Sequence, residues 1–416
     1  HSSEHESRED PPTNNEAARN FSSGLFHLGT QLTDFGPWPT FVFIPVLFGV
    51  HVSKQVLLAR GAALPPSTGF GRAHHSLEEI LQNDMVPGWS RTSTIEHQIT
   101  RSPLTRLLKR WRNHPALVST SASNSDADIL HITDQEQAHL TPSNGKIPTV
   151  VTVHDLFHLE PREIESGGTE VQVGEKTPGP VRRMDLKRMR EGLQRADLLI
   201  CISEMTLRDV QGAFPGKPTA IVRNQIDIGY WSPFENPKSR ELLSEFTDPS
   251  KCLLITVGNN EPRKRIDFVR EAISSLPTEV SRDIHLLNIG SETKLSNDQL
   301  VAAYQHAEAL LFPSYSEGFG YPPAEAMAAG CRVMAADLPA HNEFIPERCL
   351  LPPANLESWM DEIVDVHSKW KNTLGDRRTP DDSLIEHIRA RLSPEERGKA
   401  LSVAYESALQ ARGVGE

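Results

Sequence analysis

Short apolar runs alternate with amphipathic stretches along the first half of the chain. Each run is rich in Val, Ile and Leu and is bounded by turn-forming residues, which is typical of a buried strand. Between the runs, apolar residues recur every three or four positions, and this spacing predicts helices. Strands alternating with helices predict a parallel sheet covered on both faces. The predicted strands are 55–60, 128–133, 149–155, 197–203 and 219–224, the helices are 74–81, 181–196 and 204–214, and 165–180 is predicted to be a polar loop.

The same alternation starts again after a turn-rich interruption at 225–240. We place a domain junction there and expect an α/β protein with two Rossmann-like domains, at 55–235 and 236–416, facing each other across a cleft. Such a cleft is the usual place for a ligand. In the second half the predicted strands are 252–258, 283–290, 309–314 and 331–337, with helices at 266–276, 297–308 and 321–330 and helical segments up to residue 411.

Residues 1–54 do not follow this pattern and are predicted to be a disordered or irregular extension. Residues 1–20 are charged and rich in turn formers, so they bury too little apolar surface to offset the entropy of ordering. The apolar run at 41–50 is interrupted by Pro45 and is shorter than the ~20 residues that span a bilayer. No basic stretch precedes this run, so a signal peptide is not expected.

The composition narrows the class of protein. Among 416 residues, 43 Lys and Arg face 55 Asp and Glu, and the net charge of -12 argues against a nucleic-acid partner. The four cysteines have no zinc-like spacing and are expected to be reduced, buried thiols of a cytoplasmic protein. Asp126 and Asp128 form a DxD sequence, but they precede an apolar strand, so a strand-entry turn is expected. Neither a metal nor a cofactor is predicted.

The most informative segment is HAEALLFPSYSEGFGYPPAEAMAAGCRVMAADLPAHNE at 306–343. A strand ends there at a turn containing Gly318 and Gly320, where the backbone can approach a ligand, and the free N–H groups of the next helix suit a diphosphate. Glu317 and Glu325 are separated by seven residues, and two carboxylates at this spacing are able to bind both sugars of a nucleotide sugar. From spacing alone, a simple glycine turn before a capped helix explains the segment equally well.

A second segment, VGNNEPRKRIDFVREAI at 257–273, places Arg263, Lys264 and Arg265 at the start of a helix. Positive charge at this point would neutralise a departing nucleoside diphosphate. The alternative is an ordinary solvated surface.

The segment at 306–343 resembles the EX7E motif of the retaining GT-B glycosyltransferases of family GT4, including the surrounding FPS, EGFG and EAMA. The resemblance implies that Glu325 binds the nucleotide ribose. It implies that Glu317 lies near the hydroxyls of the donor sugar, with the N–H groups of Phe319 and Gly320 close by. Residues 257–273 resemble the VGR-x-x-x-x-K pattern of the same family. Lys264 matches its lysine, whereas Asn259 stands in place of its arginine, and we expect Arg263 to supply the missing charge.

The first half carries two weaker elements of this family. STGFGR at 67–72 resembles its glycine-rich loop, which implies that Gly69 and Gly71 lie near the donor diphosphate and the acceptor. TVVTVHDLFHLEP at 149–161 resembles its VHD element, which implies that His154 faces the cleft near the donor sugar. Asp155 is expected to orient His154 or to cap the following turn, and His158 is expected to be structural.

The resemblance covers roughly residues 55–410 and implies a retaining hexosyltransferase (EC 2.4). Its donor would be a UDP- or GDP-sugar and its acceptor the hydroxyl of a glycan, a lipid-linked sugar or a small molecule. Two alternatives stay open: a weakly active or inactive nucleotide-sugar-binding relative, as Asn259 suggests, and another GT-B enzyme such as a sugar phosphorylase or an epimerase. TRSPLTRLLKRWR at 100–112 mixes basic and apolar residues. This pattern predicts either peripheral contact with the inner face of a membrane or an ordinary surface helix.

Overall fold

The computed structural model describes residues 53–65, 68–99, 102–166, 169–373 and 378–413. The expectations for residues 1–52, including the apolar run at 41–50, lie outside these ranges. Inside them, the predicted alternation of strands and helices is confirmed, and it builds two separate parallel sheets. None of the helices in these ranges is long and apolar enough to span a lipid bilayer.

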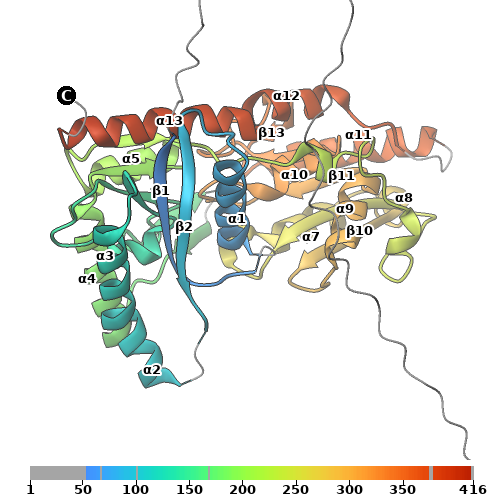
Figure 1. Cartoon of the computed structure of the whole chain (residues 1–416). Coiled ribbons are helices and arrows are strands. Elements are labelled where there is room, and N and C mark those ends of the chain that lie inside the picture. The colour runs from blue at the N-terminus through green and yellow to red at the C-terminus, as the bar shows by residue number, and fades with distance from the viewer. Residues whose placement is uncertain (1–52, 66–67, 100–101, 167–168, 374–377, 414–416) are drawn as a thin grey trace, which may run out of the picture. The chain divides into compact units, whose positions relative to one another are not determined.

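The first sheet has six parallel strands within the described residues, in the order β2-β1-β3-β4-β7-β8. Figure 1 shows β1 and β2 side by side. Its central strands are almost entirely buried, because helices cover both faces. The edge strand β2 was not predicted, since its residues are mostly polar and no apolar run marks it. The strands are β1 (Lys54–Ala62), β2 (Trp89–His97), β3 (Ile129–Ile132), β4 (Thr149–Val153), β7 (Leu198–Cys201) and β8 (Thr219–Ile221).

Residues on alternate positions of each strand belong to different cores on the two faces of this sheet. Val56 and Leu58 pack with helix α1, whereas Leu57 and Ala59 pack with helices α3, α4 and α5. The period of two that defines a strand therefore separates the two helical layers. The helical elements of this half are α1 (Gly69–Gln82), α2 (Pro103–Leu108), the π-helical turn η1 (Lys109–Asn113), α3 (His114–Asn124), the 3₁₀ turn η2 (Gln135–Leu140), α4 (Pro180–Arg195), α5 (Glu204–Ala213) and α6 (Ile228–Trp231).

An antiparallel hairpin of β5 (Arg162–Ser166) and β6 (Thr169–Val173) follows β4. It corrects the prediction of a polar loop at 165–180. Val171 and Val173 are buried on one face of the hairpin, while Gln172 between them is exposed. Two short strands with so few apolar residues give too weak an alternation to be recognised from sequence.

The second sheet has five parallel strands within the described residues, in the order β10-β9-β11-β12-β13. Its strands are β9 (Cys252–Gly258), β10 (Ile284–Gly290), β11 (Ala309–Phe312), β12 (Arg332–Ala336) and β13 (Leu350–Leu351). The sequence pattern predicted all of these except the two-residue β13. The helical elements are η3 (Arg240–Leu243), η4 (Pro262–Lys264), α7 (Ile266–Ser274), α8 (Thr278–Ser281), α9 (Asn297–His306), α10 (Tyr321–Ala328), η5 (Glu347–Cys349), α11 (Leu356–Asn372) and α12 (Asp382–Leu392).

The last helix, α13 (Pro394–Ala411), packs against the first sheet (Figure 1). Leu401 and Tyr405 belong to the same core as Val56 and Leu58, and the Tyr405 hydroxyl lies 2.7 Å from Nδ1 of His131 on β3. This core therefore contains residues from both ends of the sequence. The placement of a domain boundary at residue 235 stays a prediction.

The carboxyl ends of the two sheets are held together by polar and apolar contacts. The carboxylate of Glu343 accepts hydrogen bonds from the backbone N–H groups of Glu204 and Met205, at 2.8 and 3.0 Å. These are N–H groups at the start of α5, where a carboxylate is favourable. A small apolar cluster of Phe157, Val173, Met205 and Ala340 also joins residues from both halves. Parallel strands place their functional loops at this end, so the site is expected here.

Candidate active site

Glu317 lies at the centre of a buried cluster of charges in the loop after β11. Its carboxylate contacts Nζ of Lys264 at 2.5 Å and Nη1 of Arg263 at 2.9 Å. The hydroxyl of Ser314 donates to Oε1 of Glu317 at 2.6 Å. Burial raises the pKa of Glu317, but Lys264 and Arg263 outweigh this effect and lower the pKa to about 2. The carboxylate is therefore ionised at neutral pH, and it joins the EX7E segment to the basic segment.

The basic segment folds as a 3₁₀ turn, η4, that presents its cations to this carboxylate. Arg263 also donates to the backbone oxygen of Ser316 at 2.7 Å and to Oε2 of Glu261 at 2.6 Å. Asn259 is exposed and donates to the other oxygen of Glu261 at 2.5 Å. Asn259 and Arg263 thus share Glu261 as a hydrogen-bond acceptor. Arg265 turns away and donates to the backbone oxygen of Pro353.

The glycine turn brings the two halves into direct contact. A Cβ added to Gly318 would lie 2.3 Å from the backbone oxygen of His154, so only glycine allows this close approach. Gly320 has a φ of +103° and precedes helix α10, which has prolines in its first turn. Phe319 is buried and stacks on Phe344, with 5.2 Å between ring centroids. Gly318, Phe319 and Gly320 therefore form a fixed turn at the start of α10.

Glu325 lies inside helix α10, and its side chain is only 3% exposed. The hydroxyl of Tyr304 donates to Oε2 of Glu325 at 2.9 Å. Arg72, from helix α1 of the first half, forms an ion pair with Oε1 of Glu325. The Arg72 guanidinium lies 5.5 Å from the ring centroid of Trp231 and 5.4 Å from that of Tyr321. The carboxylate predicted to bind ribose is therefore held from both halves of the molecule.

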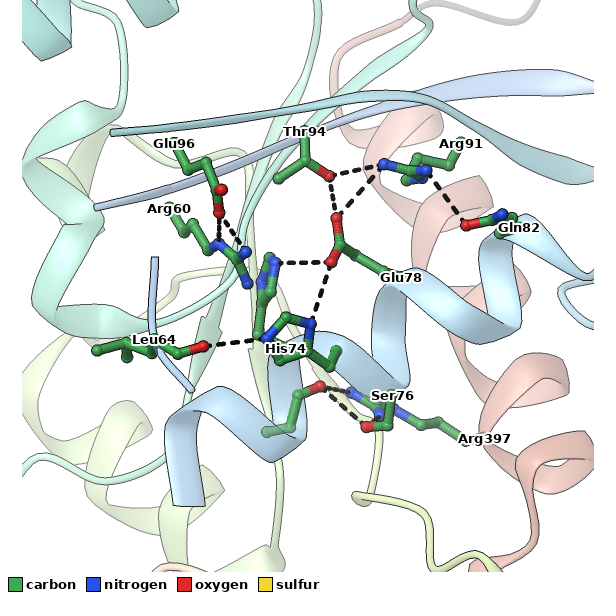
Figure 2. A network of polar contacts seen from close by, with 12 residues as sticks. Arg60, Leu64, His74, Ser76, Glu78, Gln82, Arg91, Thr94, Glu96 and Arg397 are labelled. Atoms are coloured by element: carbon green, nitrogen blue, oxygen red, sulfur yellow. Dashed lines mark hydrogen bonds and ion pairs between the residues drawn. The ribbon is translucent and has the colours of Figure 1, made fainter. Parts of the chain in front are cut away.

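Gly69 and Gly71 lie in the first turn of α1, directly before Arg72. The turn is capped by Thr68, whose hydroxyl oxygen accepts from the N–H of Gly71 at 3.0 Å. Farther along α1, Arg397 of α13 donates to the hydroxyl of Ser76 at 2.7 Å. Figure 2 shows this contact and, on another side of α1, the carboxylate of Glu78 among polar side chains of α1 and β2. These contacts hold helix α1 in place along its length, and they therefore fix the position of the Arg72 backbone.

His154 follows β4 and is buried at 7% exposure. Its backbone N–H donates to the side chain of Gln135 at 2.9 Å, and its ring lies edge-on to Phe70 at 5.0 Å. Burial lowers the pKa of His154 to about 4, so the ring is neutral at neutral pH. Asp155 accepts from the N–H of Phe157 at 3.2 Å, which is the turn-capping role, and His158 is exposed.

Two family models match the two halves that meet at this site. The model described as Glycosyltransferase Family 4 matches residues 72–230, and the model described as Glycosyl transferases group 1 matches residues 251–369. The second match includes both glutamates and the basic turn. The chain belongs to glycosyltransferase family 4.

Individual relatives are more distant than the family match. The D-inositol 3-phosphate glycosyltransferase of Mycolicibacterium gilvum is 24% identical over 293 residues, which are 62% of this chain and 60% of that protein. The O-antigen chain mannosyltransferase RfbU of Salmonella typhimurium is 36% identical over 74 residues, which are 18% of this chain and 21% of that protein. The chain therefore spans less than two thirds of the length of these curated relatives.

Solved structures show the same fold at low sequence identity. Sucrose-phosphate synthase from Thermosynechococcus elongatus has a TM-score of 0.61 and 15% identity, covering 86% of this chain and 100% of that chain. Anabaena HepE in complex with UDP-glucose has a TM-score of 0.53 and 13% identity, covering 86% and 99%. The arrangement of two parallel sheets is therefore the GT-B fold of family 4.

Three residues of this family 4 site were not singled out from the sequence: Arg72, Tyr304 and Ser314. Arg72 is part of the quoted STGFGR segment, but its partner Glu325 lies far along the chain, and only the fold brings the two together. Tyr304 lies in a helix whose apolar spacing marks it as a core residue. Ser314 is the serine of the FPS sequence beside the EX7E motif. Its position next to the motif was the signal that would have allowed its prediction as a site residue.

No metal centre was predicted, and metal requirement stays untested by the structure. Across the described ranges, no group of three or more His, Cys, Asp or Glu is arranged to hold an ion. The carboxylate of Asp128 accepts from the backbone N–H of Gln55 at 2.7 Å, which is a strand-entry contact. All four cysteines are buried and unpaired.

Proposed function

We propose that this protein is a retaining hexosyltransferase that moves a sugar from a nucleotide-sugar donor to a hydroxyl acceptor. One observation carries the proposal: Arg263 and Lys264 converge on Glu317, directly before the helix that contains Glu325. Two carboxylates and two cations on fixed elements provide groups for the ribose, the transferred sugar and the diphosphate of a nucleotide sugar.

The ribose, the transferred sugar and the diphosphate of the donor each have a partner in this arrangement. Glu325 binds the ribose hydroxyls, and Glu317 binds hydroxyls of the transferred sugar. The N–H groups of Phe319 and Gly320 point toward the diphosphate, which the start of α10 favours. The solved complex of Anabaena HepE with UDP-glucose supports a UDP-sugar donor, and a GDP-sugar is the alternative that the binding test below includes.

The reaction proceeds on one face of the donor sugar. The acceptor oxygen forms a bond to the anomeric carbon while the bond from that carbon to the diphosphate oxygen breaks, and the hydroxyl proton leaves with the diphosphate. Arg263 and Lys264 stabilise the charge on the departing diphosphate, and the two side chains thereby take the role that a divalent ion has in other enzymes. His154, whose ring is neutral at neutral pH, is the residue that we assign to the donor sugar. No protein nucleophile is required, so a covalent sugar adduct in mass spectrometry would contradict this mechanism.

The test of the proposal is calorimetric binding of UDP, GDP, ADP and TDP to the wild type and to Glu325→Ala. We expect one nucleotide to bind and the variant to lose this binding. The control is Glu245→Ala, which removes an exposed glutamate remote from the EX7E segment in sequence. If no nucleotide binds at millimolar concentration, the donor site is wrong as assigned.

A non-catalytic relative is the second candidate, and the exposed Asn259 in place of an arginine favours it. The two proposals separate in one assay. Nucleotide binding with release of nucleoside diphosphate from the cognate nucleotide sugar shows an enzyme, whereas binding without release shows a relative that only binds nucleotide sugars.

We also propose that the protein is cytoplasmic and contacts the inner face of a membrane through helix α2 and turn η1. Leu104 and Leu108 are 68% and 50% exposed in this basic segment. Trp111 does not take part, because its Nε1 donates to Asp185 at 2.6 Å. We expect Leu104→Ser with Leu108→Ser to reduce co-sedimentation with phosphatidylglycerol vesicles. Val403→Ser is the control, because Val403 is 67% exposed on another helix. Equal sedimentation of both variants would refute the contact.

A further inference from the structure

A cavity of about 570 Å³ opens beside the Arg263 turn, on the side of the first sheet. Its walls are the segments that follow β3 and β4, the end of β6, and residues 261–263. Arg263 lines this cavity and also contacts Glu317 at 2.9 Å. The cavity therefore adjoins the groups assigned to the donor, and it is large enough for a small ligand.

The hairpin β5–β6 forms a fixed wall of the cavity. Val173, at the end of β6, is 1% exposed in the apolar cluster that joins the two halves. Arg162, on the paired strand, is bound to Asp209 of α5 at 2.9 Å. Wall positions that are held in this way select ligands by their charge and shape, because they do not adapt to each ligand.

Carboxylates exceed cations on the cavity wall. Arg182 and Arg263 both line it, but Arg182 is bound by Glu136 at 2.8 Å and Arg263 by Glu261 at 2.6 Å. The remaining acidic side chains, Asp155 and Glu175, also line the cavity. Burial raises the pKa of Asp155 to about 6, so its carboxylate is still mostly ionised at neutral pH. His158 is the other titratable group on the wall. The excess of negative charge repels an anionic ligand.

Aromatic surface completes the lining. Phe70 and Phe157 line the cavity, and Phe70 is 37% exposed. Carboxylates accept hydrogen bonds from hydroxyl groups, and aromatic faces cover the C–H surface of a ring. Such a lining matches a sugar, which has both kinds of surface.

We propose that this cavity is the acceptor subsite and that it takes an uncharged, polyhydroxylated sugar while excluding phosphorylated acceptors. The proposal rests on the proposed glycosyl transfer and specifies its acceptor. Specificity of this kind comes from repulsion by Asp155 and Glu175 as much as from attraction.

The experiment measures release of nucleoside diphosphate from the cognate nucleotide sugar with matched pairs of acceptors. The probes are mannose, glucose and myo-inositol, compared respectively with mannose 6-phosphate, glucose 6-phosphate and inositol 3-phosphate. We expect the uncharged member of a pair to exceed the phosphorylated member in kcat/KM by at least about tenfold.

Glu175→Lys tests the origin of this preference, because Glu175 is exposed and its replacement leaves the core intact. We expect the preference to fall by about fivefold in Glu175→Lys and by less in Glu175→Gln. Asp361→Lys makes the same change of net charge on exposed α11 and is expected to leave the preference unchanged.

Nucleotide calorimetry on the same samples separates the two levels of the argument. If the wild type binds no nucleotide, the proposed function itself is refuted. If nucleotide binds, three results would each overturn the acceptor assignment alone. They are better turnover of any phosphorylated member, no response to the uncharged sugars, and an unchanged preference in Glu175→Lys.

Discussion

Glu317→Gln measures how strongly the central carboxylate holds the catalytic turn together. Glutamine keeps the size of the side chain and removes its charge. The contacts with Lys264 and Arg263 then change from ion pairs to hydrogen bonds with a neutral amide. Lys264 loses its carboxylate partner, whereas Arg263 keeps Glu261. We expect a less stable protein at neutral pH, with turnover reduced more strongly than nucleotide binding.

The size of the effect follows from the pKa of Glu317. Burial opposes ionisation, but Lys264 and Arg263 lower the pKa from 4.5 to about 2. Each pKa unit is worth about 1.4 kcal/mol, so the ionised carboxylate contributes about 3 kcal/mol to the free energy of unfolding at pH 7. Because the folded-state pKa is the lower one, this contribution is complete above about pH 5 and is lost as the pH falls through about 2. Roughly half of it remains at pH 3.

Urea unfolding at pH 7 and at pH 3 tests this reasoning. The difference in free energy of unfolding between the wild type and Glu317→Gln should be about 3 kcal/mol at pH 7 and about half of that at pH 3. Glu245→Gln, at an exposed glutamate, should match the wild type at both values. An equal difference at both pH values would show that the charge of Glu317 does not stabilise the fold.

Two further substitutions test the contacts between the halves. Gly318→Ala places a methyl group 2.3 Å from the backbone oxygen of His154, so we expect about 1–3 kcal/mol of destabilisation in thermal unfolding and a loss of turnover. Gly212→Ala, at a helical position with open space, should be at least as stable as the wild type. Unchanged stability of Gly318→Ala would mean that the two halves do not meet at this point. Arg72→Gln leaves Glu325 with only Tyr304, and we expect nucleotide affinity to weaken about tenfold by calorimetry. Arg91→Gln, which removes a partner of Glu78 instead, is the control, and tighter nucleotide binding by Arg72→Gln would show that Arg72 competes for the carboxylate.

The central strands of both sheets were predictable because they are buried on both faces and therefore appear as continuous apolar runs. Strand β2 lies at an edge, and hairpin β5–β6 packs only one face, so neither leaves such a run. Their existence depends on tertiary contacts that no local pattern encodes.

The candidate site likewise contains residues that local motifs predict and residues that only the fold brings together. Glu317, Glu325 and Lys264 were found from motifs within single segments, and the structure brings Lys264 to Glu317. The contact of Arg72 with Glu325 joins positions far apart in sequence, and spacing carries no information about such a pair. Whether these residues have the proposed roles stays a prediction that the experiments above address.

The packing of α13 has a consequence for the order in which the protein folds. The first sheet is synthesised early, but Leu401 and Tyr405, which complete one of its cores, are synthesised after all the strands of the second sheet. The backbone N–H of Ile226 donates to the backbone oxygen of Leu392 at 2.7 Å. The segment in which the chain leaves the first half therefore lies beside the segment in which it returns to that half. The nascent first half must wait with one face of its sheet incompletely covered until α13 has been synthesised, a period in which exposed apolar surface favours aggregation. Truncation before residue 394 would make this waiting state permanent.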